Sequence, residues 1–315
     1  MAERVLLHVG MQKTGTTYLQ AALVAAGRSL RDAGLIYPRP QVGSLLSHQL
    51  AFYGLVGPEI PHVTAARAQE LRPQWDWLAE QVAAEPGTVL LSCESLSFIR
   101  TQAAAGILDT LRPLGVHDVR VLITGRDVGR LVVSGWQQNV RNGRIAGLDD
   151  FLDWLADCRA LAERDTADAQ QVSTWRAYSV AGVAQRWARL VGADRVAIVT
   201  TRPGAPSHVL WDRFLAASGL PGLAGLPAPE VPPDAANVGM RWAEADVITA
   251  LNAALIDAGW PVEQARGLRA HIIRDGFLPR RDRGTPIAIP AHWQARVAEW
   301  SRVESERLDT LVGDG

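Results

Sequence analysis

The chain has 315 residues, of which 48% are hydrophobic and 21% charged, and its formal net charge is −1. This composition is ordinary for a globular protein, and the balanced charge gives no electrostatic support to nucleic-acid or membrane binding. Cys93 and Cys158 lie far apart, and the seven histidines are scattered without metal-ligand spacing. The first apolar run, residues 5–9, is too short for a signal peptide or a membrane span. We therefore expect a cytoplasmic protein that has no metal site.

Short apolar runs alternate with helical patterns along the first two thirds of the chain. Leucine and β-branched residues dominate the runs, as in the buried strands of a parallel sheet, at residues 5–9, 88–92, 119–123 and 196–200. Apolar residues recur at helical spacing from Leu71 to Val82 and from Val128 to Trp136. The alternation predicts an α/β fold with a P-loop-like, three-layer architecture, in which helices cover both faces of a central parallel sheet.

The last third of the chain has a different pattern. Residues 219–236 are rich in proline and glycine, which predicts a long loop. Residues 241–258 and 291–311 have helical spacing, so residues 237–315 are expected to form a helical C-terminal part. No repeat or true linker interrupts the sequence, and we expect one α/β domain over residues 1–315.

Lys13 is the only lysine of the chain, and every other basic residue is an arginine. It lies between Gly10 and Gly15, after the first predicted strand and before Thr16 and Thr17 at a predicted helix start. Glycines let backbone N–H groups turn inward around an anion, and the helix N-terminus adds partial positive charge. The two glycines keep the spacing of a Walker A loop, but the Walker A lysine would stand at position 16. The pattern therefore favours an anion site over a glycine turn with a solvated lysine.

A second candidate element follows the strand predicted at residues 119–123. Arg126 comes at the point where this strand meets the next helix, which is the usual ligand side of an open α/β sheet. Ser134 follows eight residues later, about two helical turns, so both side chains can face the same side. An arginine fork and a hydroxyl suit a phosphate group. Alone, the pair is equally compatible with a helix cap and a solvated charge.

Together these elements resemble a known family. The segment Lys13-Thr14-Gly15-Thr16-Thr17 is similar to the 5′-phosphosulfate loop of sulfotransferases that use 3′-phosphoadenosine 5′-phosphosulfate (PAPS). Arg126 and Ser134 match, in type and spacing, the residues that hold the 3′-phosphate there. Further segments resemble bacterial, largely actinobacterial, sulfotransferase-like proteins, and the resemblance covers roughly residues 4 to 220. They are Ser92-Cys93-Glu94, Trp136-Gln137-Gln138, Arg141-Asn142-Gly143, Trp175-Arg176, Arg186-Trp187, residues 199–205 and residues 210–214.

The resemblance implies a sulfotransferase that moves a sulfuryl group from PAPS to a hydroxyl or amine of a small-molecule or carbohydrate acceptor, without a metal. It implies that Lys13 stabilises the leaving phosphate oxygen, and that the donor is bound by Gly10, Gln12, Lys13, Thr14, Gly15, Thr16, Thr17, Arg126 and Ser134. Two features depart from the cytosolic enzymes of the family. Their catalytic histidine motif is absent, and only residues 280–284 stand in for the segment that closes over the nucleotide.

A general base must take the proton of the acceptor, and two residues are candidates. Glu94 is the first, because it follows the second predicted strand, where the family commonly places its base; the alternative is an ion pair with a neighbouring arginine. His48 is the second, and its alternative is a partly buried helix histidine. We expect His8 to pack within the first strand. Arg141 and Arg144 could receive an anionic acceptor or form a solvated helix terminus.

Two other functions stay open at this point. A P-loop kinase would place its lysine at residue 16 and an aspartate at the end of a neighbouring strand to hold Mg²⁺. A non-catalytic protein of the same fold would bind the nucleotide and have no activity to lose when Glu94 or His48 is replaced. Magnesium-independent nucleotide binding would separate the kinase from the other two.

Overall fold

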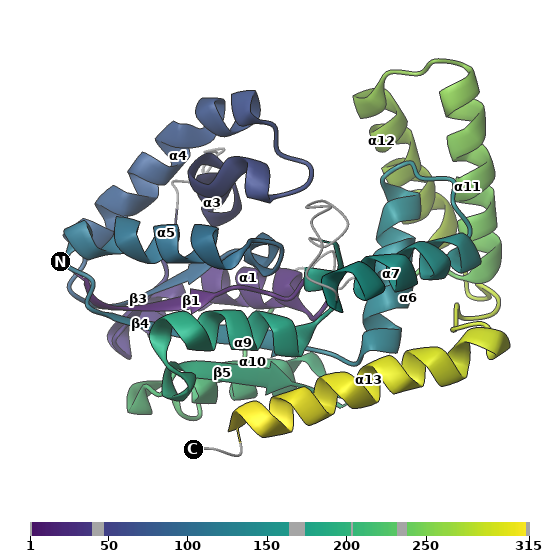
Figure 1. Ribbon diagram of the computed structural model, residues 1–315. Helices are drawn as coiled ribbons and strands as arrows, with labels where there is room; N and C mark the ends of the chain where they lie inside the picture. The colour runs from purple at the N-terminus through teal and green to yellow at the C-terminus, as the bar shows by residue number, and fades with distance from the viewer. Residues whose placement is uncertain (1, 40–46, 164–173, 203, 232–237, 313–315) are drawn as a thin grey trace.

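The computed structural model describes residues 2–39, 47–163, 174–202, 204–231 and 238–312, and its centre is a five-stranded parallel sheet (Figure 1). The strand order is β2-β3-β1-β4-β5. The bounds are β1 (Ala2–His8), β2 (Leu35–Ile36), β3 (Gly87–Ser92), β4 (Asp118–Gly125) and β5 (Val196–Thr200). Because β1 pairs with both β3 and β4, the segments that follow these three strands meet at the carboxyl edge of the sheet.

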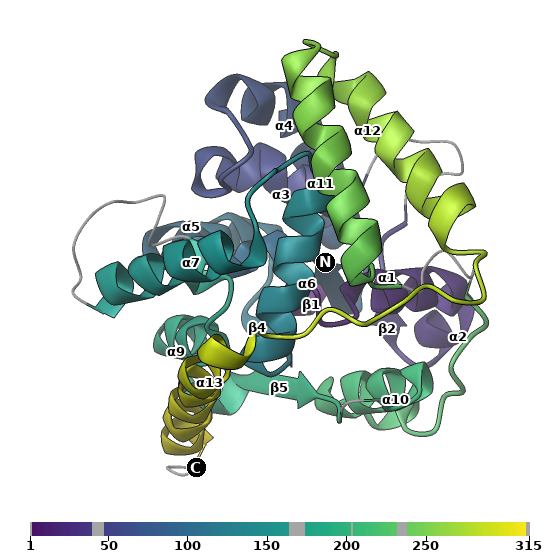
Figure 2. The same ribbon diagram turned by 90° about the vertical axis from the view of Figure 1, so that its right-hand side faces the viewer.

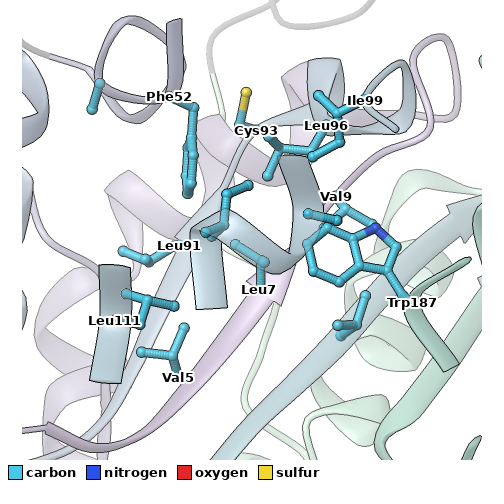
Figure 3. Packing of buried hydrophobic residues seen from close by; sticks show 14 of the residues in the cluster. Val5, Leu7, Val9, Phe52, Leu91, Cys93, Leu96, Ile99, Leu111 and Trp187 are labelled. Carbon is cyan, nitrogen blue, oxygen red and sulfur yellow. The ribbon is translucent and has the colours of Figure 1, made fainter. Parts of the chain in front are cut away.

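Alternate side chains of the strands pack on opposite faces of the sheet. On one face, Val5 and Leu7 of β1 join a cluster with Phe52 and Trp187 from the covering helices, and Leu91 of β3 lies beside them (Figure 3). The helices of this layer are α3 (His48–Val56), α4 (Ala65–Ala84), α5 (Thr101–Leu111) and α9 (Val180–Val191). Burying side chains of this size stabilises the fold by about 1.5–3 kcal/mol each.

The opposite face is covered by a second layer of helices. Leu6 of β1 and Leu122 of β4 pack there against Trp211 and Phe214. The helices are α1 (Thr16–Ala25), α2 (Gly27–Asp32) and α10 (Ser207–Ala217). The predicted α/β architecture, with a parallel sheet between two helical layers, is therefore confirmed.

A helical part lies beyond the carboxyl edge of the sheet and has its own apolar cluster, which includes Trp136, Trp175, Trp293 and Trp300 (Figures 1 and 2). It contains α6 (Val128–Arg141), α7 (Leu148–Glu163), α11 (Trp242–Asp257), α12 (Val262–His271), a π-helical segment (Ile272–Phe277) and the first part of α13 (Ala291–Val312). The rest of α13 runs back alongside α9 (Figure 1). The predicted C-terminal helical part is thus confirmed.

Helix α13 is joined to the sheet layers through a buried carboxylate. Glu304 accepts hydrogen bonds from Oγ of Ser179 (2.9 Å) and from the backbone N–H of Ala181 (2.9 Å), at the N-terminus of α9. A carboxylate in this position satisfies donors that the first helical turn leaves unpaired and complements the helix dipole. The contact ties the C-terminal helix to the layer that covers β4.

The loop predicted at residues 219–236 is described as far as residue 231, where it includes a 3₁₀ turn (Pro221–Leu223). Residues 232–236 of that prediction lie outside the described residues. Within the described parts of the chain, none of the helices is both long enough and apolar enough to cross a membrane.

Candidate functional site

The loop between β1 and α1 lies at the carboxyl edge of the sheet and is held there by backbone hydrogen bonds. The N–H of Met11 donates to the carbonyl of Thr124 (2.7 Å), and the N–H of Thr124 donates to the carbonyl of Gly10 (2.5 Å). Gly10 has a φ of 107°, and a Cβ atom there would lie 2.7 Å from the carbonyl oxygen of Glu94. Only glycine therefore allows the loop to pass this close to the segment after β3.

Helix α1 begins at Thr16 without a capping side chain. Its N-cap is Gly15, in the left-handed conformation with a φ of 94°, which makes no side-chain cap hydrogen bond to the first turn. The first turn also contains no acidic residue. The positive end of the helix dipole is therefore not compensated by an N-cap side chain or by a carboxylate of the first turn, which favours an anion there. Thr16 is buried and Thr17 is exposed.

The ammonium group of Lys13 turns toward α6. Lys13 has a φ of 64°, and its Nζ donates to Oε1 of Gln138 (2.7 Å). Partial burial is the main reason that the pKa of Lys13 falls from 10.5 to about 8; Arg141 lowers it further and Glu94 acts in the opposite direction. The ammonium is therefore poorly solvated and is close enough to a carboxylate and a guanidinium to respond to both. Its interaction with a bound anion would be stronger than in water.

Arg126 and Ser134 lie on the same side as this loop. Arg126 follows β4 directly, and its Nη1 donates to the carbonyl oxygen of Lys13 (3.1 Å). Burial is the main cause of the lowered pKa of Arg126, with the neighbouring Arg130 acting in the same direction. Ser134 is half-buried on α6, four residues before Gln138, so the two share one helix face. The structure thus brings the two predicted elements together.

Glu94 is the first residue of a 3₁₀ turn (Glu94–Ser97) that follows β3. Its Oε2 accepts a hydrogen bond from Nε2 of Gln20 on α1 (2.9 Å). The same carboxylate acts on the pKa of Lys13, which places it in the electrostatic surroundings of the ammonium. Gln12 also approaches this turn, because its Nε2 lies 3.4 Å from Oγ of Ser95. A carboxylate, an ammonium and an uncapped helix N-terminus therefore share one edge of the sheet.

His48 is not brought to this group as a free base. It is buried at the start of α3, where Nε2 contacts the carbonyl of Pro38 (2.8 Å) and Nδ1 accepts from the backbone N–H of Ser92 (3.1 Å). Burial lowers the pKa of His48 to about 4. Both ring nitrogens thus contact backbone groups of the protein, which fits the alternative of a buried helix histidine.

Two arginine segments differ from their expected roles. Arg141, expected at a solvated helix terminus, is half-buried; its Nη2 donates to the carbonyl of Val238 (2.7 Å), and burial chiefly lowers its pKa. Arg144 is exposed, as expected. In the segment at residues 280–284, Arg283 forms a buried ion pair with Glu244 (2.7 Å). That guanidinium is therefore committed to the helical part and does not point to a nucleotide-closing role.

Sequence reasoning missed the roles of Gln20 and Gln138. Gln20 is four residues after Thr16 and Gln138 four residues after Ser134, so each extends a predicted helix face by one turn. For Gln20 that spacing is the signal in the sequence, whereas Gln138 also belongs to the segment Trp136-Gln137-Gln138 of the resemblance, which gave it no role. In the described residues, no group of three or more His, Cys, Asp or Glu side chains is placed to hold a metal ion.

No family model and no curated protein matches this chain. A solved structure titled "Crystal Structure of Sulfotransferase from Alicyclobacillus acidocaldarius" is similar over 83% of this chain and 98% of that chain. The two sequences are 15% identical over the match, and the TM-score is 0.43. A likeness of this degree leaves the assignment of function to the residues of the site.

Proposed function

We propose that this chain is a sulfotransferase that uses PAPS and transfers its sulfuryl group to a hydroxyl or amine of a small-molecule or carbohydrate acceptor. The observation that carries the proposal is the convergence of two cationic elements on one uncapped helix terminus. Lys13 and the N-terminus of α1 form one anion position, and Arg126 with Ser134 forms the second. A nucleotide that has a phosphosulfate at one end and a separate phosphate nearby presents anions to both.

The residues at the sheet edge fit such a donor. The backbone turns at Gly10, Lys13 and Gly15 have positive φ values, and turns of this kind allow N–H groups to face a bound anion. Burial leaves the guanidinium of Arg126 and the ammonium of Lys13 incompletely solvated, which favours a charged partner. When bound, PAPS supplies a sulfuryl group on an anhydride that has a good leaving phosphate.

Residues of the protein stabilise the leaving group, orient the donor and accept the proton of the acceptor. Lys13 holds positive charge where the leaving phosphate oxygen gains negative charge. Arg126 and Ser134 fix the other phosphate and so orient the donor. Glu94 accepts the proton that the acceptor hydroxyl or amine loses, and Gln20 fixes its carboxylate by donating to Oε2. His48 has no free ring nitrogen for this step, so we assign the base to Glu94 alone.

The kinase alternative is less well supported by this geometry. Thr16, where a Walker A lysine would stand, is a buried side chain, and the lysine of this chain is on the loop three residues earlier.

An assay of sulfuryl transfer distinguishes the proposed function from the non-catalytic alternative. Incubation with ³⁵S-labelled PAPS and a panel of amino sugars, sugars and phenols should give a labelled product. A protein that binds the nucleotide but labels no acceptor, with Glu94→Gln unchanged from wild type, would favour the non-catalytic alternative.

A further inference from the structure

The three central strands each end in a hydrogen-bonding side chain on the same face of the sheet. Ser92, His8 and Thr124 each come two residues after a leucine that packs against α1 and α10, so they continue the same face. His8 is paired directly with Ser92 in the register of β1 and β3. All three side chains are buried, and the His8 ring stands edge-on to Phe214, 5.1 Å between centroids.

A continuous chain of hydrogen bonds runs through these residues to the anion loop. Nδ1 of His8 is 2.9 Å from Oγ of Ser92, and Nε2 of His8 is 3.2 Å from Oγ1 of Thr124. Oγ1 of Thr124 is 2.6 Å from Oγ1 of Thr14, which in turn is 2.5 Å from the carbonyl oxygen of Met11. On the other side, Nε2 of Gln20 reaches both Oγ of Ser92 (3.2 Å) and Oε2 of Glu94 (2.9 Å).

The direction of each hydrogen bond follows from its neighbours. The carbonyl of Met11 can only accept, so Thr14 donates its single hydroxyl proton there. Thr14 must then accept from Thr124, which leaves Thr124 without a proton for His8. Nε2 of His8 therefore carries the proton that binds Thr124.

The donors of the hydrogen bonds between His8, Ser92, Gln20 and Glu94 can be assigned in the same way. Complete burial lowers the pKa of His8 to about 3, so the ring is neutral and Nδ1 accepts from the hydroxyl of Ser92. Ser92 then accepts one N–H of the Gln20 amide, whose N–H groups are also directed to Glu94. Every proton in the chain is thus assigned, from the candidate base to the loop carbonyl.

We propose that His8 is a positioning residue: its ring, protonated on Nε2, fixes the anion loop through Thr124 and Thr14 and ties it, through Ser92 and Gln20, to Glu94. The role rests on the proposed function, since it concerns the loop and the base of that reaction. His8 touches no reacting atom. Its contribution is to hold two separate parts of the site at a constant distance across three strands.

The first test is independent of the reaction. ¹⁵N-labelled histidine in the full chain, with His8 assigned by comparison with His8→Gln, should show a ring that is protonated only on Nε2 from pH 5 to pH 8. A ring protonated on Nδ1, or one that gains a second proton within this range, would overturn the assignment.

The second test compares two variants that each keep half of the chain. The amide of His8→Gln can reach Thr124, whereas the amide of His8→Asn reaches only Ser92. We expect 3′-phosphoadenosine 5′-phosphate (PAP) to bind His8→Gln within about threefold of wild type and His8→Asn about tenfold more weakly, at similar melting temperatures.

The PAP affinities of the two variants decide whether His8 has a positioning role. Wild-type affinity in both variants, or equal weakening in both, would overturn the positioning role, because a purely structural histidine would not distinguish its two neighbours. If the wild type itself does not bind PAP, the sulfotransferase proposal fails, while the spectrum of His8 still decides whether the chain of hydrogen bonds exists.

Discussion

Nζ of Lys13 lies 2.7 Å from Oε1 of Gln138, although the two residues are 125 positions apart in the sequence. The carbonyl of Lys13 also accepts from Arg126, so the loop is joined to the segment after β4 at two points. Gln138 shares a helix face with Ser134, and this contact therefore brings the loop to the second anion position. A bound anion has only to compete with a neutral amide for the ammonium.

The pH dependence of nucleotide binding should follow Lys13. Its pKa of about 8 lies below the usual 10.5, so the ammonium is lost, and with it the attraction for a phosphate, as the pH rises through 8. We expect PAP affinity to fall above that pH, and by no more in total than the loss that Lys13→Ala causes, since deprotonation removes the same charge. Calorimetric titrations from pH 7 to 9.5 measure this. The PAP affinity of Lys13→Ala should depend little on pH, and a flat wild-type profile would contradict the assignment.

Replacing Arg126 should damage binding more than replacing Lys13 does. Arg126→Ala removes a charged fork from the phosphate that anchors the nucleotide, whereas Lys13 acts chiefly on the transferring group. We expect about a 10- to 100-fold loss of PAP affinity for Arg126→Ala and a smaller loss for Lys13→Ala. The matched control is Arg130→Ala, one turn along, whose half-buried guanidinium faces Asp127. A similar loss in the control would show that general charge, rather than position, governs binding.

Removing the proposed base should separate turnover from binding. Glu94→Gln keeps the shape and can still bind Gln20, but it cannot accept a proton at neutral pH. We expect turnover of the labelled-PAPS assay to fall by about 10²- to 10⁴-fold, while the Kd for PAP changes by less than about threefold. Glu263→Gln, on the exposed surface of α12, serves as the control and should behave as wild type. Undiminished turnover in Glu94→Gln would assign the base elsewhere.

The stability of the fold should depend on Glu304. Glu304→Ala leaves the buried donors of Ser179 and Ala181 unpaired at the N-terminus of α9. We expect the free energy of unfolding to fall by about 2–4 kcal/mol. Glu306→Ala is the control on the same helix, because its ion pair with Arg302 is exposed and should contribute less than about 1 kcal/mol. Thermal denaturation of both variants compares them directly, and equal melting temperatures would refute the capping role.

Local sequence determined the sheet and the loop well. Strand β5 matches its predicted bounds at Val196–Thr200, and β1, β3 and β4 differ from theirs by no more than three residues at either end, because buried parallel strands are continuous apolar runs. Strand β2 was not predicted, since two residues, Leu35 and Ile36, make no pattern. The spacing of Gly10 and Gly15 around Lys13 identified the loop, because glycine readily adopts the positive φ values with which the chain turns there.

The groups that contact the site residues could not be predicted from the local sequence pattern. Gln20 and Gln138 act because helices far apart in the sequence bring their amides to Glu94 and Lys13. The solvated alternative for Arg141 is wrong, because its guanidinium is half-buried and donates to the carbonyl of Val238, nearly a hundred residues later. Such contacts depend on tertiary packing, which periodicity does not encode.

The central claim is that the loop of Lys13 and the segment of Arg126 bind one nucleotide that has two anionic groups. Calorimetric titration of the full chain with PAP, with and without EDTA, tests it most directly. We expect one PAP to bind per chain, with the same Kd in both conditions, and Arg126→Ala to bind it more weakly than Arg130→Ala. Absence of PAP binding by the wild type, or binding that EDTA abolishes, would contradict it.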